Sequence, residues 1–229
     1  ASILYTSGTT GPSKGVMLSH GYFTNHAALH IASQGIRGAD VLYSPLAFCH
    51  VDQHVYLPTC LLTGARLAFR PRFSASRFWA DVERFGATWL AAVGWILGAV
   101  AAVDQPSPRQ RASVRRVLAA PIATESYEFF EDRLGIPMGS MFGQTEADGV
   151  TFAAPGSHPR GCAGIASPGF EVQITGTDGS RCSTGSQRRG STCAGPRRAR
   201  RSAIRRYSST SATRSRTTMR SGRSSTSRT

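Results

Sequence analysis

The chain has 229 residues, of which 40% are hydrophobic, so it can bury one sizeable globular core. Its formal net charge of +14 is typical of a nucleic-acid binder, but the charge is not evenly distributed. Residues 1–180 hold 13 Lys and Arg against 13 Asp and Glu, whereas residues 181–229 hold 14 Arg and no acidic residue. Residues 1–180 therefore do not have the strongly basic composition of a nucleic-acid-binding protein.

The first third of the chain alternates between expected strands and helices. Ile3–Tyr5 reads as the end of a buried strand that runs into a polar, glycine-rich loop over residues 6–15. Apolar residues at helical spacing predict a helix over residues 20–33, with Gly35 at its C-terminus. The next expected elements are a strand over 41–48, a helix over 51–62 that ends at Gly64, and a strand over 65–69.

The same alternation continues through the middle of the chain. Ser74 or Ser76 is expected to cap a helix that runs through Phe85 and ends at Gly86, and Thr124 to cap a helix over 125–134. The other expected elements are strands over 87–93, 114–119, 138–142 and 170–174, a helix over 95–103 and a turn over 105–108. This order predicts an α/β fold of stacked layers with mostly parallel strands.

A glycine-rich loop near the start of the chain carries the first chemical signal. Residues 5–15 read Tyr-Thr-Ser-Gly-Thr-Thr-Gly-Pro-Ser-Lys-Gly. In such a loop, backbone N–H groups and hydroxyls can donate to phosphate oxygens, and Lys14 can supply a positive charge. It is not a Walker loop, because Ser13 and Gly15 flank the lysine. By composition alone, a solvated turn is the competing interpretation.

A second motif, Met141-Phe142-Gly143-Gln144-Thr145-Glu146, lies downstream at the end of an expected strand. An aromatic ring can stack on a nucleotide base, and glycine allows the backbone to approach it. The Thr145 hydroxyl can bond a phosphate, and the Glu146 carboxylate can hold Mg²⁺ on phosphate oxygens. Taken alone, this run is better explained as a strand end with a surface glutamate.

Together, the two motifs resemble the signature motifs of the adenylate-forming (AMP-binding) superfamily, which includes acyl-CoA ligases, peptide-synthetase adenylation domains and luciferases. The resemblance implies that the chain is part of the large N-terminal domain of such an enzyme, with Thr145 and Glu146 as catalytic residues and Glu146 as the Mg²⁺ ligand. It assigns the nucleotide site to Thr6, Ser7, Gly8, Thr9, Thr10, Gly11 and Lys14 around the β- and γ-phosphates, and to Ala119, Ala120, Pro121, Phe142 and Gly143 around the adenine.

The resemblance also places a substrate pocket around His50, Val93 and Asp148. Two departures affect this assignment. The run that precedes His50 is one residue longer than the family's pattern, and Gly94 stands where the family usually has proline.

The reaction implied by the resemblance is the activation of a carboxylic acid by ATP and Mg²⁺ to an acyl-adenylate, followed by transfer to coenzyme A. Val16–His20 resembles the CoA ligases, which links the chain to fatty acid metabolism, and the run from His50 to Gln53 has a faint likeness to crotonobetaine/carnitine-CoA ligases. Two alternatives remain open. One is an adenylation module that loads a carrier protein, and the other is a non-catalytic product whose basic tail binds nucleic acid nonspecifically.

The resemblance ends near residue 179, which divides the chain into a partial adenylation domain, 1–179, and an Arg/Ser/Thr-rich tail, 180–229. The tail is predicted to be disordered and to arise from a shifted reading frame, since the family's Thr-Gly-Asp motif and its lysine-bearing C-terminal domain are missing. We therefore expect a fragment, truncated at both ends, that is inactive alone.

The remaining patterns concern the compartment. The five cysteines show no paired spacing, so no disulfide framework is predicted. No apolar run is long enough to span a bilayer, and no signal peptide is visible. A cytoplasmic location is the expected default, with oligomeric state left open.

Overall fold

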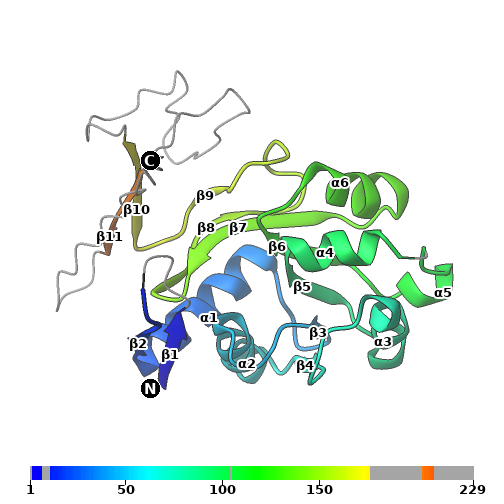
Figure 1. Cartoon of the computed structure of the whole chain (residues 1–229), viewed down its shortest axis with the longest axis horizontal. Helices are drawn as coiled ribbons and strands as arrows, with labels where there is room; N and C mark the ends of the chain where they lie inside the picture. The colour runs from blue at the N-terminus through cyan, green and yellow to red at the C-terminus, as the bar shows by residue number, and fades with distance from the viewer. Residues whose placement is uncertain (1, 7–10, 104, 176–202, 209–229) are drawn as a thin grey trace, which may run out of the picture.

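The computed structural model describes residues 2–6, 11–103, 105–175 and 203–208, and its centre is a seven-stranded sheet (Figure 1). The strand order is β4-β3-β5-β6-β7-β8-β9. Strands β3 to β7 run parallel, while β8 and β9 are antiparallel to their neighbours, so the predicted mostly parallel α/β fold is confirmed. The bounds are Val41–Ser44 (β3), Arg66–Phe69 (β4), Trp89–Val93 (β5), Arg116–Ala120 (β6), Met138–Gln144 (β7), Ala147–Ala153 (β8) and Ile165–Ala166 (β9).

Helices cover both faces of this sheet and make a three-layer structure (Figure 1). Side chains alternate along each strand, so Leu42 packs with the helices of one face and Tyr43 with those of the other. One face carries α1 (His20–Gln34) and α2 (Val51–Thr63), and the other carries α3 (Phe78–Phe85), α4 (Gly94–Ala101), α6 (Thr124–Tyr127) and the π-helical turn η2 (Glu128–Arg133).

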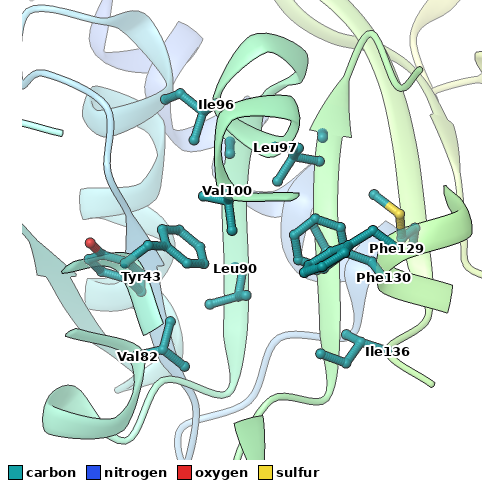
Figure 2. Packing of buried hydrophobic residues seen from close by; sticks show 14 of the residues in the cluster. Tyr43, Val82, Leu90, Ile96, Leu97, Val100, Phe129, Phe130 and Ile136 are labelled. Atoms are coloured by element: carbon teal, nitrogen blue, oxygen red, sulfur yellow. The ribbon is translucent and has the colours of Figure 1, made fainter. Parts of the chain in front are cut away.

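The larger core lies between the sheet and the second helical layer (Figure 2). Phe130 from η2 and Leu97 from α4 are fully buried in it, next to Leu90 of β5. The parallel strands therefore have apolar side chains on both faces, as the near-continuous hydrophobic runs predict. The other labelled members in Figure 2 are Tyr43, Val82, Ile96, Val100, Phe129 and Ile136.

A separate antiparallel hairpin precedes the sheet. Strands β1 (Ser2–Thr6) and β2 (Lys14–Leu18) flank the glycine-rich loop, and Thr6 pairs with Lys14 at its base. Leu4 and Leu18 pack against Val51 and Val55 in the first turns of α2. The hairpin is thereby fixed beside the N-terminus of α2 (Figure 1).

Most expected helix ends are confirmed. Gly35, Gly64 and Gly86 adopt left-handed backbone conformations at the C-termini of α1, α2 and α3, as their positions in the sequence predict. The Ser19 side chain caps α1 by accepting a hydrogen bond from the Tyr22 N–H.

Several local expectations were wrong. The expected strand 41–48 ends at Ser44, and the expected turn 105–108 leads into a short helix, α5 (Pro108–Arg111), which Ser107 caps. Thr124 is the first residue of α6 rather than its cap, a position that Ala123 takes. Ser74 occupies the cap position of the 3-10 turn η1 (Ala75–Arg77) without a side-chain hydrogen bond. These differences concern element ends, which tertiary packing adjusts.

The C-terminal part of the described chain adds a two-stranded ribbon. Strand β10 (Phe170–Thr175) was expected, and it pairs antiparallel with β11 (Ala203–Ser208), which lies in the Arg/Ser/Thr-rich segment. Cys162 is disulfide-bonded, which corrects the expectation drawn from cysteine spacing. Among the described helices, none has the length and apolar character needed to cross a bilayer.

Candidate functional site

The candidate site lies at the carboxyl ends of the parallel strands. Strand β5 ends at Val93, β6 at Ala120 and β7 at Gln144, and Val93 is the register partner of Ala120. Ligands of open α/β sheets bind in the crevice outside the carboxyl ends of the strands. The predicted substrate residue Val93 and the predicted adenine residue Ala120 are therefore neighbours on adjacent strands.

A cavity of about 260 Å³ opens beside the first turn of α2, and we call it the α2 cavity. The three predicted substrate residues, His50, Val93 and Asp148, all line it. The rest of its wall is formed by Val51, Asp52 and Tyr56 from α2, by Ala92, Leu118, Ala119 and Ala120 from β5 and β6, by Met141, Gly143 and Gln144 from β7, and by Thr145.

A second cavity of about 430 Å³, the Pro121 cavity, adjoins the first. Four predicted adenine residues line it, namely Ala120, Pro121, Phe142 and Gly143. The fifth, Ala119, lines the α2 cavity instead. The two cavities share Ala120, Met141 and Gly143, so one wall separates the two predicted binding regions.

Close packing of the neighbouring backbone explains why residue 143 is a glycine. A Cβ atom at this position would stand 2.7 Å from the Gly149 amide nitrogen and 3.1 Å from the Asp148 Cα. Strand β7 is irregular here, with a register shift against β8 between Phe142 and Gln144. The glycine therefore permits the close approach of β7 and β8 at the cavity wall.

The phosphate-loop motif is described only at its two ends. Thr6 is half-buried, while Gly11 and Lys14 are exposed, and the Thr6 hydroxyl donates to the Lys14 carbonyl oxygen at 3.4 Å. Ser7, Gly8, Thr9 and Thr10 lie outside the described residues. None of the three described residues lines either cavity.

Tyr22 links helix α1, which follows the hairpin, to the turn that holds Thr145 and Glu146. Its hydroxyl donates to the carbonyl oxygen of Thr145 at 2.9 Å and accepts from the backbone N–H of Asp148 at 3.2 Å. Helix α1 follows β2 directly, so these bonds connect the segment after the phosphate loop to the turn that holds Thr145 and Glu146. Burial, reinforced by the charge of Asp148, raises the pKa of Tyr22, so the hydroxyl keeps its proton.

A buried His–Asp pair supports the same turn. His30 Nε2 lies 3.0 Å from Asp148 Oδ2, and the two side chains are 0% and 2% exposed. The His30 ring packs edge-on against Tyr56 and Phe152, which fixes its position between α1, α2 and β8. Asp148 is thus held at the cavity wall by side-chain and backbone contacts together.

Asp52 gives the α2 cavity a second carboxylate. Burial raises the pKa of Asp52 to about 6, with a further contribution from the charge of Asp148. Its backbone N–H donates to Nδ1 of His50 at 3.3 Å, which caps α2. His50 therefore has a structural role as an N-cap in addition to its place in the cavity wall.

The residues present fit a magnesium nucleotide. Among the described residues, no cluster of three or more metal-ligating side chains occurs, so a protein-built metal cage is not found there. Mg²⁺ in phosphoryl chemistry is held by one or two carboxylates together with substrate phosphates, and the exposed Glu146 next to Thr145 suits that mode. The side-chain nitrogen of Gln144 is buried and has no hydrogen-bond partner in the described chain, so a donor is available at the cavity wall.

Sequence reasoning missed Tyr22, Asp52, Tyr56 and Gln144. A signal for the first three was present, because residues four apart lie on the same side of a helix. Asp52 and Tyr56 have this spacing in α2, and Tyr22, His26 and His30 form a polar stripe at the same spacing in α1. Gln144 was read only as the variable position of its motif.

Comparison with known proteins agrees with this geometry. The pattern of the family described as AMP-binding enzyme matches residues 1–195. A sulfoacetate--CoA ligase of Cupriavidus necator is 32% identical over 185 residues, which are 78% of this chain and 36% of that protein. Long-chain fatty acid transport protein 1 of Mus musculus is 32% identical over 147 residues, 63% of this chain and 23% of that protein. The chain thus spans roughly a quarter to a third of these relatives.

Solved structures share the fold. ATP-bound MatB from Rhodopseudomonas palustris superposes with a TM-score of 0.74 at 24% identity, covering 90% of this chain and 39% of that one. The N-terminal domain of FACL13 from Mycobacterium tuberculosis gives a TM-score of 0.69 at 25% identity, over 79% of this chain and 46% of that one. With the family pattern matched over most of its length, the chain belongs to the AMP-binding enzyme family.

Proposed function

We propose that the protein to which this chain belongs activates a carboxylic acid with ATP and Mg²⁺ to an acyl-adenylate, and then transfers the acyl group to coenzyme A. The observation that carries the proposal is the pair of adjoining cavities at the strand ends, which share a wall beside Thr145. The α2 cavity would hold the acid and the Pro121 cavity the adenine, and the reaction would take place at their common wall. Membership of the family supports the same reaction.

The chain's own residues would act by positioning. The Pro121 cavity would receive the adenine, and the Thr145 hydroxyl would bond the α-phosphate. Lys14 would neutralise phosphate charge, and Glu146 would hold Mg²⁺ when the metal is bound. In phosphoryl chemistry of this kind, orientation and charge neutralisation supply most of the catalysis. Tyr22 would keep the Thr145 turn in place through its hydrogen bond to the carbonyl oxygen.

Coenzyme A is the acceptor that the relatives favour. One relative is a sulfoacetate--CoA ligase, and another is the 4-coumarate--CoA ligase-like 4 of Oryza sativa, 30% identical over 188 residues. Since both are named for CoA, we propose CoA over a carrier protein. The likeness to crotonobetaine/carnitine-CoA ligases stays a prediction.

This chain alone should bind MgATP and form no thioester, because the relatives it matches are about two to three times as long. Calorimetric titration with MgATP tests the first half. Lys14→Met and Glu146→Gln should each weaken binding, whereas Arg109→Gln, at an exposed ion pair with Glu83, should leave it unchanged. Equal binding by all four proteins, or no binding by the unaltered chain, would contradict the proposed nucleotide site. Thioester formation from acid, MgATP and CoA would contradict the proposed inactivity.

A further inference from the structure

A group of exposed aromatic rings lies at the carboxyl ends of three adjacent strands. Phe69 is the last residue of β4, Phe48 follows β3, and Trp95 lies in the first turn of α4, directly after β5. In that order, the three side chains are 45%, 43% and 66% exposed. Because β4, β3 and β5 are neighbours in the sheet, the rings lie along one edge of it. We call them, together with Phe73, the aromatic rim.

Contacts between the rings hold the aromatic rim in place. The ring centroids of Phe48 and Phe69 are 5.5 Å apart, and Phe73 meets Trp95 edge-on at 5.4 Å. Phe73 also packs against the larger core, which anchors its pair with Trp95. None of the four rings lines the α2 cavity or the Pro121 cavity. The rim is therefore a surface separate from the candidate nucleotide and acid sites.

The segment that carries most of the rim is basic. Residues 53–80 contain four arginines and no acidic residue. Arg70 is bound to the buried Asp81 at 2.6 Å. Arg72 and Arg77, in contrast, are exposed, and neither forms an ion pair with a described residue. The turn η1, which holds Arg77, contacts α4. Two unpaired guanidinium groups therefore belong to the same surface as the rings.

Exposed rings combined with unpaired guanidinium groups match the chemistry of an anionic lipid surface. Aromatic side chains concentrate at the boundary between lipid headgroups and acyl chains, and Arg places its charge among the headgroup phosphates. Each basic side chain near an anionic membrane strengthens binding about fivefold. The hydroxyls of Ser74 and Ser76 hydrogen-bond each other at 3.3 Å, which leaves rings and charges as the means of recognition in this segment.

We propose that the aromatic rim is a docking surface for a lipid bilayer that carries anionic headgroups. The exposed rings of Phe48, Phe69 and Trp95 lie at the headgroup boundary, and Arg72 and Arg77 bind lipid phosphates. The protein rests on the bilayer surface rather than crossing it. This inference does not depend on the proposed function, because none of these residues is assigned to nucleotide or acid binding.

Trp95 provides a reporter for this surface. Of the three tryptophans, Trp79 and Trp89 are 4% and 0% exposed, so a quencher within a bilayer reaches Trp95 selectively. The full chain would be mixed with vesicles of phosphatidylcholine and phosphatidylglycerol in equal amounts, with bromine on the acyl chains as the quencher. We expect the fluorescence to be quenched and the emission to move to shorter wavelength. Trp95→Phe should show neither change.

The arginine variants must be read by the depth of Trp95 rather than by vesicle binding. The 14 arginines of residues 181–229 can hold the chain at an anionic vesicle by themselves. Arg72→Gln combined with Arg77→Gln should lower the quenching at saturating lipid at least about twofold. Arg37→Gln combined with Arg109→Gln removes the same charge from segments that precede β3 and β6, and should leave the quenching unchanged. The tail is identical in all these proteins, so its contribution cancels.

Three results would overturn the inference. The first is a chain whose Trp95 stays unquenched, whether or not the chain binds the vesicles. The second is equal quenching in the two double variants. The third is Trp95 emission that moves to shorter wavelength as protein concentration rises without lipid, because a second copy would then cover the rim. The comparison of the unaltered chain with Trp95→Phe needs no arginine variant, so a misfolded double variant does not remove the test.

Discussion

The hydroxyl of Tyr22 donates to the carbonyl oxygen of Thr145 across 123 positions of sequence, and it also accepts from the N–H of Asp148. Two motifs that are distant in the chain are connected through this single side chain. It gives the turn that holds Thr145 and Glu146 a partner on helix α1, directly after the β1–β2 hairpin.

Tyr22→Phe should therefore act on both stability and binding. The change leaves the buried N–H of Asp148 without a partner, at a cost of about 1–3 kcal/mol in the free energy of unfolding. MgATP affinity should fall as well, because the Thr145 turn loses its tie. Urea unfolding and calorimetry measure the two effects. Phe23→Leu offers a control on the same helix that removes no hydrogen bond. Unchanged stability in Tyr22→Phe would show that the hydrogen bonds of the Tyr22 hydroxyl do not stabilise the fold.

Gly94→Ala should destabilise the protein. An added Cβ would stand 2.1 Å from the carbonyl oxygen of Pro121, so the start of α4 and the Pro121 turn would have to separate. We expect a loss of about 1–3 kcal/mol, the range for overpacking. Gly98→Ala is the matched control in the same helix, because nothing lies within 4 Å of its added Cβ. Thermal unfolding of both variants measures the difference, and equal melting temperatures would contradict the packing argument.

Asp52→Asn should stabilise the fold at neutral pH. The pKa of Asp52 is raised from 3.8 to about 6, so the folded state binds more protons than the unfolded state between these values. The group's contribution to stability falls as pH rises through this window and stays low above it. The asparagine variant should gain on the order of 2 kcal/mol above pH 6 and nothing near pH 4. Chemical unfolding across this range checks the sign, and a pH-independent difference would refute it.

Asp40 should show the opposite pH dependence. Burial raises its pKa, but hydrogen bonds from Thr88 and Arg115 outweigh burial and hold the pKa below its usual value. Its contribution to stability is therefore present at neutral pH and is lost as pH falls below about 4. Asp40→Asn should lose about 1–3 kcal/mol at pH 7, with a smaller loss in acid. A loss that grows as pH falls would contradict this assignment.

The parallel part of the sheet could be predicted because each of its strands and helices has a local pattern of apolar residues and turn signals in the sequence. Strand β8 could not, although it is buried along its whole length. Its Asp148-Gly149 pair is a turn signal, and Gly149 does adopt a positive φ of 57°, yet the segment continues as a strand against β7. Antiparallel pairing with a neighbour outweighs the local preference.

The same distinction applies to the candidate site, where some residues could be predicted from the sequence and others could not. His50, Val93 and Asp148 were predicted by their likeness to a family pattern, and the structure brings all three to one cavity. Tyr22 and Gln144 acquire their importance only from contacts made through the fold. No pattern within a short window reports the hydroxyl of a helix residue meeting a carbonyl far along the chain.

The contact between His30 and Asp148 has a consequence for biosynthesis. The two residues are 118 positions apart, so helix α1 leaves the ribosome long before β8 exists to receive it. Until β8 is made, the buried His30 side chain lacks its Asp148 partner, although α1 can already pack on α2. Chains that are interrupted before β8 would keep this face open to chaperones or to other nascent chains.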